Sequence, residues 1–447
     1  MKIDFLDRVF AEAESKDAII WRDQSYSYRW LRDAITAADE ALAAASVTAG
    51  SVVMIEGDFS PRAVATLLAA IKRDCIVAPF SNTGEERRGF FTEMAEIEQV
   101  VTVSMDDRIS VEKTGRTAAH AHYAELRRRG HPGIVLFSSG SSGTPKGSVN
   151  DLVPWLKKFD VRRQVLRTIS FLLFDHIGGF NTLLYCLSNG GCVITVDERS
   201  PDAVLGAVER HRVELLPTSP TFINLILLSE AHQRHDLSSL KLVTYGTEPM
   251  PERTLLRFHE VLPQVQLLQT YGLSEVGILR SKSRSSDSLW VRVGGEGYET
   301  RVVDGMFQIR SASAMLGYLN APSPFTEDGW FMTGDRVDVD GEYVRFLGRA
   351  SEQINVGGEK VYPAEVENVI LELETVAEVT VYGEKHAIVG EVVIACVRPL
   401  SPETDSKALV AAVKKHCAAR LARYKVPVKV EITNEALYTG RFKKRRG

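Results

Sequence analysis

The stretch SVVMIEGDFSPRAVATLLAAIKRDCIVAPF, residues 51–80, places two short apolar runs on either side of a helical pattern. The runs at 51–57 and 75–80 are rich in β-branched side chains, which is typical of buried strands. Residues 61–74 between them are predicted to form a helix. A strand, a crossover helix and a second strand predict neighbouring parallel strands, so we expect this part of the chain to have an α/β fold.

The same alternation continues further along the chain. Residues 190–275 contain the apolar runs CVITVD, ELLPTSP, KLVTYG and VQLLQTYG, with helical patterns over 201–213 and 251–260. After about residue 290 the chain becomes rich in β-branched and aromatic residues, with Gly and Asp at the turns. This change predicts hairpins that form a small β subdomain.

A third pattern begins at residue 352 and predicts an α+β unit. Its expected strands lie near 352–356, 376–382 and 428–432, and its expected helices over 363–373 and 405–422. Glycine and small polar residues interrupt the pattern at 348–351. We therefore predict a large N-terminal domain of αβ-layered sheets with a small β subdomain (1–347), a hinge (348–351) and a small α+β C-terminal domain (352–447).

The composition excludes several classes of protein. The 447 residues are 44% hydrophobic and 25% charged with a formal net charge of -4, so no global attraction to nucleic acid or anionic lipid is expected. No apolar stretch approaches the ~20 residues of a membrane span, and the N-terminus lacks the apolar core of a signal peptide. The five cysteines are scattered without CxxC spacing, which argues against a disulfide framework or a zinc site. We expect a cytoplasmic protein with no nucleic-acid partner and no membrane span.

The most informative segment is FSSGSSGTPKGS, residues 137–148, which directly follows the apolar run GIVLF. Small residues let backbone N–H groups approach phosphate oxygens, hydroxyl side chains add donors, and a lysine supplies positive charge. The segment is not a Walker A motif, because Pro145 precedes the lysine and Gly147 follows it. A flexible serine-rich linker is the alternative. The candidate phosphate-binding residues are Ser138, Ser139, Gly140, Ser141, Ser142, Gly143, Thr144 and Lys146.

This segment resembles the phosphate loop of the adenylate-forming superfamily, which comprises acyl- and aryl-CoA ligases, adenylation domains and luciferases. Three further motifs follow in the family's order: TYGLSE (270–275), TGD with a later GR (333–335 and 348–349), and INVGGEKVYPAEVE (354–367). By motif the resemblance covers about residues 130–447. It implies an acyl-CoA synthetase-like fold whose small C-terminal domain is mobile.

The resemblance implies a site for ATP and Mg²⁺. Glu275, which we also expect to be catalytic, and Thr144 would hold the metal, because Mg²⁺ prefers oxygen ligands. Asp335 would accept hydrogen bonds from the ribose hydroxyls, and Arg349 would also reach the nucleotide. The other expected nucleotide contacts are Gly246, Thr247, Glu248, Thr270, Tyr271, Gly272, Leu273 and Ser274.

An acyl pocket and a coenzyme A site are implied in the same way. FDHIGGFNTLL (174–184) resembles the motif in which an aromatic or histidine side chain borders the carboxylate, so His176 is expected to be catalytic. A purely structural histidine is the alternative. The expected acyl-pocket residues are His176, Gly179, Thr218 and Tyr245. Gly357, Gly358, Glu359 and Lys360 are expected to bind coenzyme A.

The C-terminal tail departs from the family pattern. A lysine that reaches the α-phosphate usually stands in Gly-Lys-x-x-Arg, whereas this chain reads YTGRFKKRRG and has Arg441 in that position. Arginine keeps the charge, but its planar fork differs from a compact ammonium group. We expect Lys443 to be the catalytic cation, with Arg441 and Lys444 as rivals and a solvated basic tail as the alternative. Ser351 stands at the hinge position, which usually holds Asp or Lys.

We therefore predict an AMP-forming acid–thiol ligase, an acyl-CoA synthetase that uses ATP, Mg²⁺ and coenzyme A. It would convert a small carboxylic acid to its acyl-AMP with release of pyrophosphate, and would then form the CoA thioester. A carrier-protein phosphopantetheine arm or a nitrogen nucleophile is the alternative acceptor. A catalytically silent nucleotide-binding partner is the alternative to an enzyme. The sequence leaves open the identity of the acid and the choice between monomer and homodimer.

Overall fold

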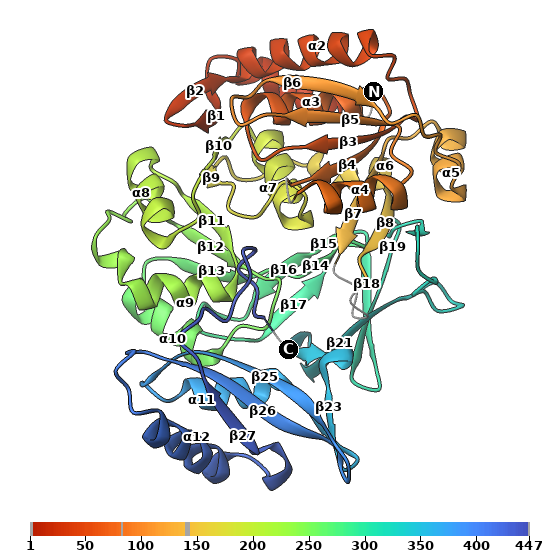
Figure 1. The fold of residues 1–447 in the computed structure, drawn as a ribbon. Helices are drawn as coiled ribbons and strands as arrows, with labels where there is room; N and C mark the ends of the chain where they lie inside the picture. The colour runs from red at the N-terminus through yellow and green to blue at the C-terminus, as the bar shows by residue number, and fades with distance from the viewer. Residues whose placement is uncertain (1–2, 82–83, 139–143, 446–447) are drawn as a thin grey trace.

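The computed structural model describes residues 3–81, 84–138 and 144–445 (Figure 1). The N-terminal part contains two seven-stranded sheets with helices and a six-stranded antiparallel sheet, and the C-terminal part contains a five-stranded sheet. The predicted fold class, α/β with a small β subdomain and a small α+β C-terminal domain, is confirmed. In the described ranges, no helix combines the length and the apolar character that crossing a membrane requires.

The second seven-stranded sheet contains the segment that predicts the fold. Its strands run in the order β20 (Gly317–Tyr318), β8 (Lys146–Asp151), β7 (Gly133–Ser138), β4 (Ile76–Phe80), β3 (Val52–Glu56), β5 (Gln99–Val103) and β6 (Ile109–Lys113). β3 and β4 pair in parallel, as expected, and α3 (Pro61–Lys72) connects them. This helix begins where the hydroxyl of Ser60 accepts a hydrogen bond from the N–H of Ala63 (3.2 Å).

The first seven-stranded sheet carries the later alternation of strands and helices. Its order is β13 (Gln266–Gln269), β12 (Leu242–Tyr245), β11 (Leu215–Thr218), β9 (Arg167–Ile169), β10 (Cys192–Ile194), β1 (Asp17–Trp21) and β2 (Gln24–Ser27). All neighbouring strands are parallel except β1 and β2, which form a hairpin. The predicted helices are present as α8 (Pro201–His211) and α10 (Glu252–Val261).

Helices cover both of these sheets and form three apolar cores with them. The remaining helices are α1 (Asp4–Glu12), α2 (Tyr28–Ala44), α4 (Glu85–Met94), α5 (Ala121–Arg129), α6 (Leu152–Leu156), α7 (Ile177–Ser188) and α9 (Pro220–Ser229), with the 3₁₀ helices η1 (Lys157–Phe159) and η2 (Ala231–Gln233). One core joins α1, α2, α3 and α7. A second joins α8, α9 and α10 to the first sheet, and a third joins α4 and α5 to the second sheet.

The predicted β subdomain is a six-stranded antiparallel sheet. Its order is β16 (Arg280–Ser283), β17 (Val291–Gly294), β22 (Tyr343–Arg349), β21 (Phe331–Asp340), β19 (Met306–Ser311) and β18 (Tyr298–Val303). The sheet begins ten residues before the expected change in pattern, because β16 is a polar strand with no buried residue. The short hairpin of β14 (Gly272–Leu273) and β15 (Gly277–Ile278) precedes it.

The C-terminal part contains all five expected elements. They are β23 (Ile354–Val356), α11 (Pro363–Leu371), β25 (Val376–His386), α12 (Ser406–Arg420) and β27 (Lys429–Ile432). The structure adds β24 (Glu359–Val361) and β26 (Gly390–Pro399), and the second of these pairs with both β25 and β27. The 3₁₀ helix η3 (Ala350–Glu352) lies at the predicted hinge. In Figure 1 the last residues leave this sheet and return towards the first sheet of the N-terminal part.

Candidate active site

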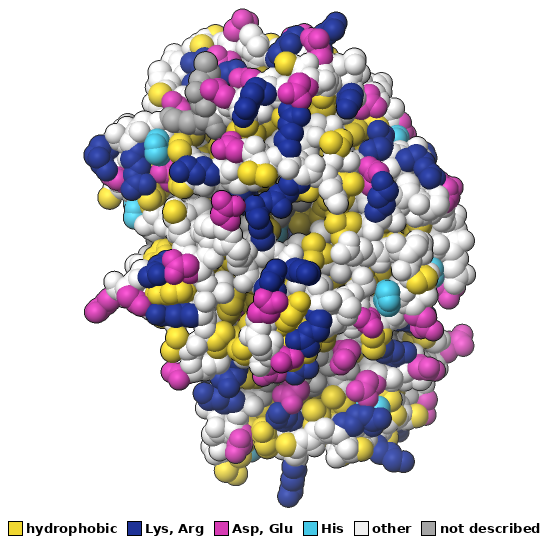
Figure 2. Space-filling view, turned by 180° about the vertical axis from the view of Figure 1, so that it is seen from behind, with side chains coloured by type: hydrophobic (Ala, Val, Ile, Leu, Met, Phe, Trp, Pro, Cys, Tyr) yellow, Lys and Arg dark blue, Asp and Glu magenta, His cyan; other side chains and the backbone are white. Residues whose placement is uncertain are grey.

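A cavity of about 1870 Å³ lies where the two αβ sheets present the carboxyl ends of their parallel strands. Thr218, Gly246 and Thr270 line it from the first sheet, and Ser81 and Ser138 line it from the second. In open α/β sheets the loops at these strand ends form the usual ligand crevice. Figure 2 shows a hollow near the middle of one face, bordered by Lys and Arg side chains.

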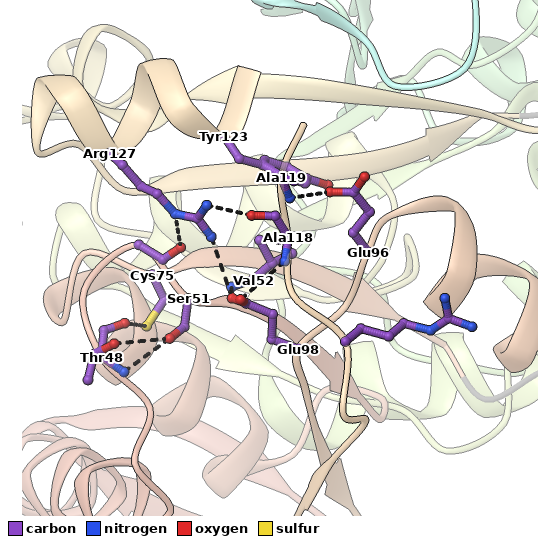
Figure 3. A network of polar contacts seen from close by, with 12 residues as sticks. Thr48, Ser51, Val52, Cys75, Glu96, Glu98, Ala118, Ala119, Tyr123 and Arg127 are labelled. Atoms are coloured by element: carbon purple, nitrogen blue, oxygen red, sulfur yellow. Dashed lines mark hydrogen bonds and ion pairs between the residues drawn. The ribbon is translucent and has the colours of Figure 1, made fainter. Parts of the chain in front are cut away.

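At the amino ends of the parallel strands of the second sheet, the polar groups bind one another (Figure 3). The Glu98 carboxylate accepts a hydrogen bond from the N–H of Val52 (2.8 Å) and pairs with Arg127 (3.5 Å). Arg127 also donates to the carbonyl oxygens of Gly50 (3.0 Å) and Ala118 (2.6 Å). These polar groups are satisfied by one another, so this edge holds the fold together and offers little to a ligand.

Several buried polar atoms at the cavity wall lack such partners. The hydroxyl oxygens of Ser81 and Thr218 and the Oδ1 atom of Asp175 have no hydrogen-bond partner among the described residues, and all three residues line the cavity. A buried polar group without a partner is costly. These atoms therefore mark places where a bound ligand or water would complete the hydrogen bonding.

The expected phosphate-binding segment reaches the same cavity. Ser138 lines it and pairs with Lys146 across the β7–β8 ladder, whereas Thr144 is exposed. The Lys146 ammonium nitrogen lies 5.2 Å from the centre of the Tyr318 ring, and the Tyr318 hydroxyl donates to Glu275 Oε1 (2.7 Å). One tyrosine thus connects the predicted phosphate lysine to the predicted metal-binding acid. The expected contacts Ser139, Gly140, Ser141, Ser142 and Gly143 lie outside the described residues.

Glu275 is a buried acid that faces the cavity. Its Oε2 atom has no hydrogen-bond partner in the described ranges, so one carboxylate oxygen remains for a ligand. The described residues contain no group of three or more His, Cys, Asp and Glu that could hold a metal. This donor set fits Mg²⁺, which commonly binds to one or two carboxylates and completes its coordination with substrate phosphates and water.

The two segments expected to contact the nucleotide lie side by side, because they follow the neighbouring parallel strands β12 and β13. Gly246, Thr247 and Glu248 line the cavity after β12, and five residues of the TYGLSE segment line it after β13: Thr270, Gly272, Leu273, Ser274 and Glu275. Tyr271 is not among the lining residues, although it was expected at the nucleotide. The side chain of Tyr271 stacks on Phe346, with ring centres 4.3 Å apart.

The hydroxyl of Tyr271 donates to Asp335, which also pairs with Arg349 (3.4 Å). Burial raises the pKa of Asp335, and the Arg349 charge opposes that rise. Arg349 itself lines the cavity. Asp335, the expected ribose-binding acid, is not among the lining residues, so both it and Tyr271 lie behind Arg349 at the cavity wall.

His176 borders the cavity at the start of α7. Its Nδ1 atom accepts a hydrogen bond from the N–H of Gly178 (3.0 Å), so the side chain caps the helix. Burial, together with the charges of Lys443 and Arg441, lowers the pKa of His176 to about 3. The ring is therefore neutral at pH 7 and, because Nδ1 accepts, Nε2 carries the proton. The structural and functional interpretations of His176 are both compatible with this geometry.

Two expected acyl-pocket residues do not line the cavity, whereas Thr218 does. Gly179 faces the backbone carbonyl oxygen of Leu173, which a Cβ atom would meet at 2.1 Å, and the neighbouring Gly178 lines the cavity instead. Tyr245 is buried in the core of the first sheet. Successive strand residues point to opposite faces, so on β12 it is Thr244 that faces the cavity.

The C-terminal tail enters the cavity and separates the three candidate cations. Arg441 pairs with Asp175 (2.6 Å), and Lys444 pairs with the buried Glu367 of the C-terminal domain (2.7 Å). The Lys443 ammonium group lines the cavity and makes no hydrogen bond or ion pair with any residue that the structure describes. Burial lowers the pKa of Lys443, and the charge of Glu248 opposes this.

The expected coenzyme A residues lie elsewhere. Gly357, Gly358, Glu359 and Lys360 belong to the turn and second strand of the β23–β24 hairpin, and all four are exposed. None of them lines the cavity. Gly357 and Gly358 have φ angles of 61° and 93°, a conformation that side-chain-bearing residues rarely adopt.

A polar stripe on α7 was not among the expected site residues. Gly178, Asn181, Thr182 and Tyr185 line the cavity from this otherwise apolar helix. Their spacing of i, i+3, i+4 and i+7 places them on one helical face, and that spacing was available in the sequence. Lys158 on η1 also lines the cavity, and no motif pointed to it.

Comparison with known proteins identifies matches over most of the chain. Residues 6–306 match the model of the AMP-binding enzyme family, and residues 365–443 match that of the AMP-binding enzyme C-terminal domain. The chain is 28% identical to an indoleacetate–CoA ligase of Aromatoleum aromaticum, over 97% of this chain and 94% of the relative. It is 30% identical to acyl-CoA synthetase 7 of Caenorhabditis elegans over 69% of this chain, but spans only 63% of that relative.

Solved structures share the whole fold. The anthranilate CoA ligase AuaEII, in complex with anthranoyl-AMP, superimposes with a TM-score of 0.84 at 21% identity, covering 99% of this chain and 95% of that one. The amide bond synthetase McbA from Marinactinospora thermotolerans gives a TM-score of 0.79 at 23% identity, covering 99% and 97%. At these identities the likeness is one of fold.

Proposed function

The chain belongs to the AMP-binding enzyme family, and from that premise we propose that it is an AMP-forming acid–thiol ligase. It activates a carboxylic acid with ATP as the acyl-AMP, releases pyrophosphate, and then transfers the acyl group to the thiol of coenzyme A. The observation that carries the proposal is one shared cavity. Ser138 at the start of the phosphate segment, the acid Glu275, the helix cap His176 and the tail cation Lys443 all line it.

The first step needs positioning and charge stabilisation more than covalent chemistry from the protein. A carboxylate oxygen forms a bond to the α-phosphorus of ATP, and the bond between that phosphorus and the bridging oxygen of pyrophosphate breaks. Lys443, whose ammonium group has no protein partner among the described residues, supplies positive charge to the phosphate oxygens. The protonated Nε2 of neutral His176 is available to orient the attacking carboxylate.

The remaining residues of the site bind the nucleotide. Asp335, held by Tyr271 and Arg349, accepts hydrogen bonds from the ribose hydroxyls. The free oxygen of Glu275 and the hydroxyl of Thr144 would hold Mg²⁺, which neutralises charge on the leaving pyrophosphate when it is bound. Lys146 adds a further positive charge beside Glu275, across Tyr318.

The second step requires a different arrangement of the small domain. In the present arrangement the tail occupies the cavity, and the hairpin with Gly357 and Gly358 is exposed outside it. A rotation about residues 348–351 would withdraw Lys443 and bring the hairpin to the acyl-AMP. The thiolate of coenzyme A then attacks the acyl carbon, and AMP leaves as the acyl–oxygen bond breaks.

ATP–pyrophosphate exchange with a panel of carboxylic acids tests the first step. We expect exchange that depends on one class of acid, followed by release of AMP that depends on coenzyme A. AMP release with an amine or a phosphopantetheinylated carrier protein, but not with coenzyme A, would show that the acceptor is not coenzyme A. The proposed adenylation step would stand. ATP binding without exchange for any acid would instead identify a silent nucleotide-binding protein.

A further inference from the structure

The cavity contains a lysine that the adenylation chemistry does not use. Lys158 lies on η1, is partly buried and lines the cavity together with Phe159. In the described ranges no carboxylate forms an ion pair with it, whereas Arg441 and Lys444 of the tail both have acidic partners. A partly buried cation without a counter-ion is unusual in a protein interior.

The surroundings hold this ammonium group in one place. Lys158 Nζ donates to the side-chain oxygen of Asn181 (2.7 Å) and to the carbonyl oxygen of Ile278 (3.2 Å). It lies 4.4 Å from the centre of the Trp155 ring and 5.1 Å from that of Phe159, so two aromatic faces also favour the charge. Burial opposes them and lowers the pKa of Lys158 to about 7. Two neutral acceptors leave one of the three N–H donors of a protonated lysine unused.

The position of Asn181 locates the ammonium group relative to the reaction centre. His176 caps α7 and Gly178 lines the cavity beside it, whereas Asn181 lines the same face three residues further along. At 1.5 Å per residue, Asn181 lies about 4.5 Å deeper along the helix than Gly178. Thr182 and Tyr185 continue the polar face, so this part of the wall is not built for a purely aliphatic chain.

Resting on the proposed function, we infer that Lys158 is a specificity-determining residue, and that the preferred substrate carries a second anionic oxygen, such as a second carboxylate, about one helical turn from the carboxylate that is activated. The second group would accept the unused N–H of Lys158 and supply the counter-ion that the described residues do not provide. A purely apolar acyl group would leave the ammonium group desolvated and unpaired, or force it to lose its proton.

Matched pairs of acids test this inference in the whole enzyme. ATP–pyrophosphate exchange is measured with succinate, glutarate, adipate and isophthalate, and with the monomethyl ester of each. We expect kcat/KM for at least one diacid to exceed that of its ester by about ten- to hundredfold, the range of a hydrogen-bonded charge. A kcat/KM for every ester that equals or exceeds that of its diacid would overturn the inference. This comparison uses the wild-type enzyme alone, so it does not depend on whether a variant folds.

Two variants of neighbouring lysines complete the test. Lys158→Met should lower the ratio of kcat/KM for the diacid to kcat/KM for its ester by about ten- to hundredfold, because the cation that pairs with the second carboxylate is lost. Lys157→Met, at an exposed position outside the cavity wall, should leave this ratio unchanged. Equal losses for both members of a pair would mean that Lys158 only braces α7, and would overturn the inference while adenylation stands. Absence of exchange with every acid, by contrast, would refute the proposed function itself.

Discussion

The small C-terminal domain presents two segments with opposite relations to the cavity. The tail around Arg441–Lys444 lies inside it, tied to the N-terminal part by the pair of Arg441 with Asp175 (2.6 Å). The β23–β24 hairpin has an exposed Gly-Gly turn that lines no part of the cavity. The C-terminal domain carries both segments, so the rotation that we propose would withdraw the tail as it brings the hairpin to the site. We propose that this arrangement serves adenylation and that thioester formation requires a rearrangement of the C-terminal domain.

The largest loss of activity is expected for a substitution in the tail. Lys443→Ala should lower ATP–pyrophosphate exchange by about 100- to 1000-fold, because the charge that faces the developing phosphate charge is lost. Thioester formation from supplied acyl-AMP should stay within about threefold of the wild type. Lys444→Ala is the matched control, since that ammonium group is bound to Glu367 (2.7 Å), and its effect on exchange should be far smaller. Equal losses of exchange and of thioester formation in Lys443→Ala would refute a role for Lys443 in adenylation alone.

A smaller loss of exchange is expected when the ion pair between Arg441 of the tail and Asp175 is broken. Arg441→Gln and Asp175→Asn should each lower exchange by about tenfold, since a partly buried hydrogen-bonded charge pair is broken. The double variant should be little worse than either single one, which a double-mutant cycle measures. Arg445→Gln, at an exposed neighbouring position, should leave exchange unchanged. Additive losses would show that Arg441 and Asp175 act separately, with Arg441 as a direct phosphate contact.

A smaller effect is expected on the hairpin side. Gly358→Ala introduces a Cβ atom into open space but at a φ angle of 93°, so only the backbone of the turn is disturbed. CoA-dependent release of AMP should fall about three- to tenfold, corresponding to the cost of strained backbone, while exchange is unchanged. Gly329→Ala is the control, because its φ angle is 81° and its surroundings are also open. A fall in exchange with Gly358→Ala would place the hairpin in adenylation.

The smallest expected effect is a change in the pH at which exchange is lost on the alkaline side. Burial lowers the pKa of Lys443, and the protonated form is the active one. Exchange should therefore be retained below that pKa and lost as pH rises through it, at a lower pH than an ordinary lysine would give. Lys443→Arg should move this loss upward, because arginine stays protonated. An alkaline limb that is the same in both enzymes would assign the titration to another group.

Sequence reasoning predicted the fold well because its signals are local. The βαβ unit of residues 51–80 and the α+β pattern after residue 352 depend on apolar periodicity and turn residues, which neighbouring positions determine. The strands β24 and β26 were not predicted. Tyr245 was expected in the acyl pocket but lies in the core of the first sheet, because alternation along β12 defines two faces without showing which of them meets the cavity.

The site was harder to predict where it depends on contacts between distant segments. Motif register favoured Arg441 in the tail, and only the fold reveals that Asp175, far away in the sequence, takes up its charge. Tyr271 stands behind the wall because its hydroxyl meets Asp335, a contact that spans sixty-four residues. Lys158 carries no motif, and only the three-dimensional contacts show that it donates to Asn181 and Ile278 and forms no ion pair with a carboxylate of the described residues.

We propose that Ser138 and Lys146, at the two ends of the expected phosphate-binding segment, and Glu275 hold the same triphosphate from two sides. A crystal structure of the protein with a non-hydrolysable ATP analogue and Mg²⁺ tests it most directly. We predict phosphate density between Ser138 and Glu275, with the metal on the free Glu275 oxygen and Lys443 beside the α-phosphate. Nucleotide bound in a different place, or phosphates that touch only one of the two segments, would contradict the account.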